Sequence, residues 1–147
     1  MFIIFSGLPG MGKSTISELL AKRIGAVWLR IDSIEQAIRA SGVLPNLEDI
    51  GPSGYMAANR IEADNLHLRY KVIADSVNPI KITRDAYRDT ATQLGVRFLE
   101  VETTCLDKSK HRHRVENRQT TVEGRALPSW QQVENRCYEP WDRSRLG

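Results

Sequence analysis

The stretch MFIIFSGLPGMGKST, residues 1–15, passes from an apolar run into a glycine-rich turn and then into a helix. It matches the pattern G-x-x-x-x-G-K-[ST] in full. The fixed positions of this pattern are filled by Gly7, Gly12, Lys13 and Ser14. Residues 1–5 read as a buried strand, and apolar residues repeat with helical spacing from Ser14 up to Gly25. A strand, a loop and a helix in this order predict a phosphate-binding loop, whereas a chance glycine turn would not need both flanking elements.

Each part of this loop has its own role toward a phosphate group. The glycines let the backbone turn with its N–H groups pointing inward, and the following helix adds its positive N-terminal dipole. Lys13 is predicted to reach the β- and γ-phosphates of ATP, and the Ser14 hydroxyl to hold Mg²⁺ on the same oxygens. The predicted nucleotide contacts are Gly7, Leu8, Pro9, Gly10, Met11, Gly12, Lys13, Ser14 and Thr15.

The composition is that of an ordinary globular protein. The chain has 147 residues, of which 41% are hydrophobic and 27% charged, which suits a single domain over residues 1–147. No apolar run approaches the roughly 20 residues of a membrane span, and Met1 opens directly on the first strand without room for a signal peptide, so a cytoplasmic protein is expected. Cys105 and Cys137 have no metal-like spacing and are expected to be reduced. A net charge of +3 does not by itself indicate a nucleic-acid partner.

Two further strands are predicted to end in a carboxylate. In a doubly wound α/β fold, ligands bind outside the carboxyl ends of the strands. AVWLRID, residues 26–32, places Asp32 there, either as the base for an acceptor hydroxyl or as the cap of a helix starting at Ser33. KVIADSVNP, residues 71–79, places Asp75 there, either as a second Mg²⁺ ligand with Ser14 or as the cap of a turn.

The remaining elements follow from periodicity and from breakers. Thr83 is the expected N-cap of one helix, and two prolines with three glycines predict a mobile loop over residues 42–54. Helices are expected over residues 33–40, 53–69, 83–94, 107–118 and 129–138, and a fourth strand over residues 96–105.

A basic segment follows the fourth strand. Lys110, Arg114 and Arg118 are spaced i, i+4, i+8 and are predicted to share one face of a helix. This segment is either a solvated surface helix or a lid over about residues 106–127 that brings guanidinium groups to a phosphoryl group in transfer. If the segment is a lid, the predicted catalytic residues are Lys13, Asp32, Arg114 and Arg118, with Arg112 as a further nucleotide contact.

Five motifs together resemble a known group of proteins. They are G-L-P-G-M-G-K-S-T, R-I-D-S at residues 30–33, V-I-A-D-S-V-N-P, I-T-R-D-A-Y-R-D, and H-R-V-E-N-R before a W-x-x-V-x-x-R helix. The chain resembles, over nearly its whole length, the small P-loop kinase-like family of AAA-domain predicted kinases. That family is similar to chloramphenicol phosphotransferase, gluconate kinase, the kinase domain of polynucleotide kinase and zeta toxins.

The resemblance implies a three-layer α/β/α sandwich with a parallel sheet of four strands in the order 2-3-1-4 and a helical lid. It implies an ATP- and Mg²⁺-dependent phosphotransferase that acts on a hydroxyl of a small molecule or nucleotide. Asp32 matches the carboxylate that activates the acceptor, Arg114 and Arg118 match lid positions, and Arg84 lies where relatives contact substrate. Relatives usually continue into a fifth strand, for which the sequence shows no clear segment.

The acceptor is not named by any motif. Its specificity is expected to come from residues 42–65 and from a mouth formed with Arg84 and Arg88. Two other functions stay open at this point. One is a nucleotide-binding module without turnover, and the other is a nucleic-acid 5′-hydroxyl kinase, which is less favoured because few aromatic residues lie near the basic segment.

Overall fold

The computed structural model describes residues 1–44, 46 and 50–142, so part of the loop expected over residues 42–54 lies outside the described residues. Five helices and four strands precede a short last helix along the chain. In order they are β1 (Phe2–Ser6), α1 (Lys13–Ile24), β2 (Val27–Arg30), α2 (Ile31–Ala40), α3 (Ser53–His67), β3 (Val72–Asp75), α4 (Lys81–Gln93), β4 (Phe98–Glu102), α5 (Lys108–Asn117) and α6 (Trp130–Glu134). No helix within these residues is long and apolar enough to cross a membrane.

The strands form one parallel sheet in the order β2-β3-β1-β4. In the centre of the sheet, Ile3 of β1 lies opposite Ile73 of β3 on one side and Leu99 of β4 on the other. This order confirms the predicted fold class. It places β1, which leads into the glycine-rich loop, beside β3, which ends in Asp75.

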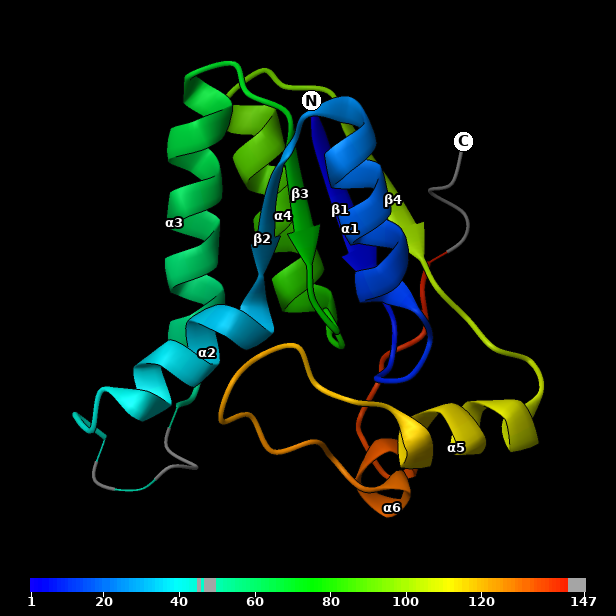
Figure 1. Ribbon diagram of the computed structural model, residues 1–147. Coiled ribbons are helices and arrows are strands. Elements are labelled where there is room, and N and C mark those ends of the chain that lie inside the picture. Colours follow the sequence, from blue (N-terminus) through cyan, green and yellow to red (C-terminus); the bar gives the residue numbers. More distant parts are fainter. Residues whose placement is uncertain (45, 47–49, 143–147) are drawn as a thin grey trace.

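The sheet is covered by helices on both faces (Figure 1). Side chains of β1 alternate between the faces, as successive residues of a strand must. Ile3 and Phe5 pack with Ala21 of α1, whereas Phe2 and Ile4 pack with side chains of α3 and α4. Burial on both faces explains why the two central strands, β1 and β3, are mostly apolar runs.

Elements beyond β4 gather at the carboxyl ends of the strands. Figure 1 shows α5, α6 and the connection between them below the sheet, next to the glycine-rich loop and α2. This is the edge at which a parallel α/β sheet binds ligands.

Helix α2 begins earlier than predicted. Arg30 is its N-cap, Ile31 is buried in its first turn, and Asp32 is its second residue. Asp32 therefore is not the cap of a helix starting at Ser33. Because Ile31 is buried in the first turn, the helix begins directly after β2. The Asp32 carboxylate therefore does not cap the helix and can contact other residues.

Helix α4 also begins earlier than predicted, at Lys81, and Thr83 is not its N-cap. The Lys81 N–H donates to Glu139 Oε2 at 2.5 Å, so a carboxylate far along the chain caps this helix. The Thr83 hydroxyl instead donates to Asn78 Oδ1 at 2.6 Å.

Two other predicted elements are shorter in the structure. Strand β4 covers residues 98–102 instead of 96–105, and α6 covers residues 130–134 instead of 129–138. Ser129 is the N-cap of α6, in a capping box with Gln132. The chain after α6 is irregular and passes back to the start of α4.

Candidate active site

The loop between β1 and α1 presents backbone N–H groups that have no acceptor within the described chain. They belong to Gly10, Gly12, Lys13 and Ser14. Gly10 and Gly12 have φ angles of 81° and 83°, a left-handed conformation that favours glycine. A Cβ on Gly10 would lie 2.6 Å from Val115 Cγ2, so the loop and α5 meet closely here. Unpaired donors at the start of a helix form an anion-binding nest.

Gly7 and Leu8 support this loop from behind. The Gly7 N–H donates to the Val77 carbonyl at 3.1 Å, and a Cβ on Gly7 would lie 2.5 Å from the Thr103 carbonyl oxygen. The Leu8 carbonyl accepts a hydrogen bond from Lys13 Nζ at 3.4 Å. These two residues therefore hold the loop and its lysine in place.

Lys13 lies in the buried part of the site. Burial lowers the pKa of its ammonium group, and the carboxylates of Asp75 and Asp32 oppose this shift. The side chain is thus held where two strand-end carboxylates are within electrostatic range. A bound polyphosphate would place further negative charge near Lys13 and favour its protonated form.

Asp75 is oriented by α1 and β2. The Ser17 hydroxyl donates to Asp75 Oδ2 at 3.0 Å, and Trp28 Nε1 donates to the Ser17 hydroxyl oxygen at 3.0 Å. Ser17 lies one turn after Ser14 on α1, so the Asp75 carboxylate and the Ser14 hydroxyl belong to neighbouring parts of the site. Both groups are hard oxygen donors, and they fit Mg²⁺ that keeps several waters. No cluster of three or more His, Cys, Asp or Glu side chains that could bind a metal occurs among the residues the structure describes.

Ser17 and Trp28 were not predicted to take part in the site, although the position of Ser17 in the sequence indicates it. Ser17 is a polar residue on the same helix face as Ser14 and directly behind the loop, so a role there could have been inferred. Trp28 lies in an apolar strand, where its ring packs against the core, and neither its hydrogen bond to Ser17 nor its place in the site can be read from that apolar pattern.

Asp32 is bound by a residue from the connection between α5 and α6. Arg125 Nη2 lies 2.9 Å from Asp32 Oδ1, and both side chains are largely shielded from solvent. Arg125 was not predicted, because the polar stretch from Arg118 to Pro128 has no periodicity. The ion pair ties this connection to the start of α2.

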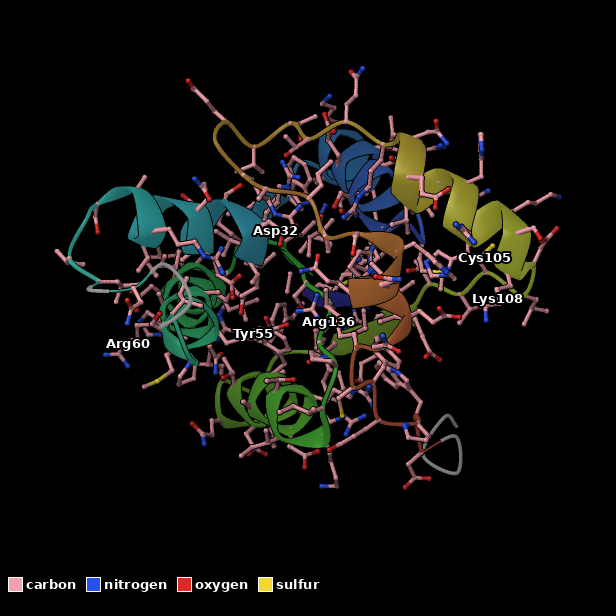
Figure 2. All side chains as sticks on the ribbon, turned by 90° about the horizontal axis from the view of Figure 1, so that it is seen from below. Asp32, Tyr55, Arg60, Cys105, Lys108 and Arg136 are labelled. Carbon is pink, nitrogen blue, oxygen red and sulfur yellow. The ribbon has the colours of Figure 1, made fainter. Side chains whose placement is uncertain are left out.

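Two cavities meet at this ion pair. The first, which we call the loop cavity, has a volume of about 730 Å³ and is bounded by residues 9–15, by Trp28 and Arg30, and by residues 113–121. The second, the α2 cavity, has a volume of about 650 Å³ and lies between α2, Tyr55, residues 124–128 and Arg136. Both cavities are lined by Asp32, Val77, Arg125 and Leu127. Figure 2 shows Asp32, Tyr55 and Arg136 on the α2 side of this region.

Arg114 and Arg118 both line the loop cavity, but they do not share a helical face. Helix α5 ends at Asn117, and Arg118 has the extended angles φ −76° and ψ 153°. The side-chain amide of Asn117 donates to the His113 carbonyl at 2.8 Å in this last turn. The Nε and Nη2 atoms of Arg118 are buried without a hydrogen-bond partner in the described chain, and burial lowers the pKa of this guanidinium.

The structure does not bring Arg112 to the loop cavity. Its Nε donates to Glu116 Oε1 at 2.8 Å on the exposed side of α5. Lys110, the third residue of the predicted basic face, is exposed and does not line the cavity either. Two arginines therefore line the cavity from α5 and the residue after it, and a third, Arg125, lines it from the connection that follows.

The base of α5 is attached to the phosphate-binding loop by His111. Its Nε2 is 2.8 Å from the Pro9 carbonyl oxygen, and its ring makes an edge contact with Trp130 of α6 at 5.1 Å between centroids. His111 is buried, and sequence analysis assigned it no role. It joins α5, α6 and the loop into one unit.

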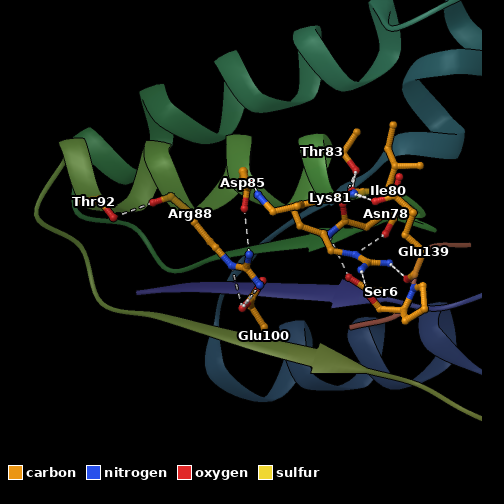
Figure 3. A network of polar contacts seen from close by, with 12 residues as sticks. Ser6, Asn78, Ile80, Lys81, Thr83, Asp85, Arg88, Thr92, Glu100 and Glu139 are labelled. Carbon is orange, nitrogen blue, oxygen red and sulfur yellow. Dashed lines mark hydrogen bonds and ion pairs between the residues drawn. The ribbon is translucent and has the colours of Figure 1, made fainter. Parts of the chain in front are cut away.

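Arg84 and Arg88 do not form the mouth that was predicted for the acceptor. Neither lines the loop cavity or the α2 cavity. Arg84 is buried and donates to backbone carbonyls of Asn78, Pro79, Glu139 and Pro140. Arg88 pairs with Glu100 and Asp85 at 3.0 Å, as Figure 3 shows. The Arg84 guanidinium fixes the turn after β3 and the segment after α6, and Arg88 ties α4 to β4; the short-range pattern I-T-R-D-A-Y-R-D cannot reveal these contacts.

A parallel sheet in the order β2-β3-β1-β4, with a glycine-rich loop between β1 and α1, defines a P-loop kinase-like fold. The model of one protein family, described as the AAA domain, matches residues 2–137. The chain therefore belongs to this family, which confirms the resemblance found in the sequence. No curated protein sequence matches the chain significantly.

Several solved structures are similar at low identity. A candidate kinase of Chloroflexus aurantiacus J-10-fl is 18% identical with a TM-score of 0.63, over 70% of this chain and 58% of that one. The APS kinase of Mycobacterium tuberculosis, in complex with AMPPNP and APS, is 19% identical with a TM-score of 0.59, over 76% and 66% of the two chains. A gluconokinase of Sinorhizobium meliloti 1021 is 22% identical with a TM-score of 0.61, over 94% and 74%. The chain thus spans less than two thirds of the first two, and these likenesses establish the fold.

Proposed function

We propose that this protein is a phosphotransferase that moves the γ-phosphoryl group of ATP to a hydroxyl group of a small molecule. The observation that carries the proposal is the meeting of two cavities at Asp32 and Arg125. One cavity has a phosphate-binding loop, and the other begins at a carboxylate that can accept a proton. Phosphoryl transfer needs this arrangement, because donor and acceptor must be held in line.

On the donor side, the unpaired N–H groups of the loop and Lys13 would bind the β- and γ-phosphates. Arg118 and Arg114 would lie beside the γ-phosphoryl group, where charge develops on its oxygens during transfer. Mg²⁺, if held by Ser14 and Asp75, would neutralise phosphate charge. The chain's own contribution is therefore mainly positioning and electrostatic stabilisation.

On the acceptor side, Asp32 is assigned as the proton acceptor. The bond between the γ-phosphorus and the β–γ bridging oxygen breaks, and a new bond forms to the acceptor oxygen, whose proton passes to Asp32. Arg125, 2.9 Å from Asp32, would add positive charge beside the transferred phosphoryl group. The names of the structural relatives, APS kinase and gluconokinase, support a small-molecule acceptor.

The test is acceptor-dependent release of ADP from ATP with Mg²⁺, measured against a panel of sugars, sugar acids, nucleosides and 5′-hydroxyl oligonucleotides. Asp32→Asn keeps the size of the side chain and is expected to lower turnover by about 10²–10⁴-fold while ATP still binds. Asp89→Asn, an exposed carboxylate of α4 outside both cavities, is the matched control and is expected to change nothing. Tight ATP binding with no acceptor-stimulated turnover would instead identify a nucleotide-binding module.

A further inference from the structure

The described residues around the α2 cavity carry more positive than negative charge. Among them are three arginines, Arg39, Arg125 and Arg136, and two carboxylates, Asp32 and Glu35. Arg125 is paired with Asp32 at 2.9 Å, and Arg39 lies 3.7 Å from Glu35. The third arginine, Arg136, is exposed to solvent at the edge of the cavity and has no ion pair or side-chain hydrogen bond among the described residues. One cation therefore faces this cavity without a fixed partner.

The second carboxylate of the cavity does not restore the balance. Burial raises the pKa of Glu35, and the nearby Arg39 and Arg136 oppose this shift only in part. Glu35 is packed against the start of α3, because a Cβ on Gly54 would lie 2.4 Å from Glu35 Cγ. A carboxyl group held in this way is suited to hydrogen bonding with a hydroxyl, and less to neutralising a distant arginine.

Arg136 and Asp32 bound the cavity from different segments. Asp32 comes from α2 and Arg136 from the residues after α6, and Figure 2 shows both in the central part of the molecule with Tyr55. Arg136 is within electrostatic range of both Glu35 and Tyr55. A ligand that reaches from Asp32 into the cavity thus approaches the unpaired guanidinium.

We propose that the α2 cavity binds a small hydroxylated anion, whose carboxylate, phosphate or sulfate group contacts Arg136 while a hydroxyl group lies at Asp32. This inference rests on the proposed function for the role of the hydroxyl, but the binding of the anion can be tested separately. A guanidinium binds such planar or tetrahedral oxyanions through paired hydrogen bonds. A cavity of about 650 Å³ accommodates a ligand of sugar to nucleotide size.

The experiment is a calorimetric titration of the protein saturated with Mg²⁺ and AMPPNP, which occupies the phosphate-binding loop and prevents turnover. The probes are matched pairs of one anion and its neutral counterpart: gluconate and glucitol, glucose 6-phosphate and glucose, glucose 6-sulfate and glucose. We expect at least one anion to bind about tenfold or more tightly than its neutral partner. Comparing the three pairs identifies which anionic group the site prefers.

Variants assign the effect to the cavity. Arg136→Gln is expected to remove the preference for the anion, and Arg136→Lys to restore part of it. Arg60→Gln, an exposed arginine on the outer side of α3, is the matched control and is expected to keep the preference (Figure 2). The same variants are compared in acceptor-dependent ADP release.

The outcomes separate the two proposals. Neutral probes that bind as well as the anions, or an anion preference that Arg136→Gln leaves intact, would overturn the inference about the α2 cavity whether or not the protein is a kinase. Anions that bind through Arg136 but never stimulate ADP release would support the inference and contradict the proposed function.

Discussion

The two cavities that meet at Asp32 are built in different ways. The loop cavity takes its phosphate-binding wall from seven consecutive residues, 9–15, and much of that wall is backbone. The α2 cavity is assembled from side chains of α2, α3, the connection between α5 and α6, and the residue Arg136. A backbone site depends on local conformation, whereas a side-chain site depends on the packing of distant segments. The loop cavity is therefore suited to a phosphate group that many proteins bind, and the α2 cavity to a ligand that differs from one protein to another.

The largest expected effect concerns Glu62 of α3, the helix that carries Tyr55 to the α2 cavity. Its two carboxylate oxygens are buried without a partner in the described chain, and burial raises the pKa of Glu62 from 4.5 to about 8. Below pH 4.5 the group is protonated in both states. Between pH 4.5 and about 8 only the unfolded chain ionises, so the free energy of unfolding falls by about 5 kcal/mol.

Denaturant unfolding across this pH range measures that fall. Glu62→Gln is expected to flatten the profile, and Asp64→Asn, an exposed carboxylate on the same helix, to leave it steep. Hydrogen exchange at high pH should then show faster opening in α3 than in α1. Equal opening of both helices would contradict a local effect of Glu62 on α3.

The next effect concerns Arg118, whose buried guanidinium faces the loop cavity. Arg118→Gln is expected to lower turnover by about 10³-fold, because an arginine at the transferring phosphoryl group acts mainly in the transition state. The dissociation constant of ATP should change much less. Arg112→Gln, which removes a cation on the outside of α5, should leave kcat unchanged. A large decrease of kcat in this variant would show that Arg112 takes part in catalysis.

Lys13→Met is expected to weaken ATP binding by about 10- to 100-fold, the effect of losing charge-assisted hydrogen bonds to phosphate. The protein itself should be as stable as before or more so, because the variant removes a buried cation. Titration with a fluorescent ATP analogue and thermal unfolding measure the two quantities. A strong loss of stability would show that Lys13 serves the fold and would undermine its assignment to phosphate.

The smallest effect concerns the indole N–H of Trp28. Trp28→Phe removes its hydrogen bond to Ser17 and is expected to destabilise the Asp75 arrangement by about 1 kcal/mol. The concentration of Mg²⁺ needed for half-maximal turnover should rise severalfold. Trp141→Phe removes a similar bond to Tyr138, far from Asp75, and serves as the control that should not change this Mg²⁺ dependence.

The same difference between the cavities decided what could be predicted from sequence. The loop pattern and the apolar strands are local signals, and the structure agrees with them in the fold and in the surroundings of Lys13 and Ser14. Arg125 has no such signal. Arg136 ends the pattern W-x-x-V-x-x-R, but that pattern does not reveal that it lies near Glu35, about a hundred residues earlier in the chain.

The errors at single residues have a related cause. Arg84 lies in a pattern that suggested substrate, but its partners are backbone carbonyls of residues 139 and 140, which no local pattern reveals. Arg118 follows Arg114 with helical spacing, yet helix α5 ends at Asn117 and the backbone of Arg118 is extended. Thr83 was predicted to cap α4, but the N–H of Lys81 at the start of this helix donates to Glu139, again a residue distant in sequence.

The ion pair between Asp32 and Arg125 belongs to both cavities, and this has a thermodynamic consequence. A ligand in either cavity changes the environment of the same pair, so the occupancy of one cavity alters the affinity of the other. Linkage requires the change to be reciprocal: the factor by which ATP tightens or weakens binding of the acceptor equals the factor by which the acceptor alters binding of ATP. If the two cavities hold the two proposed substrates, titrating each one with and without the other is therefore expected to give the same coupling factor in both directions.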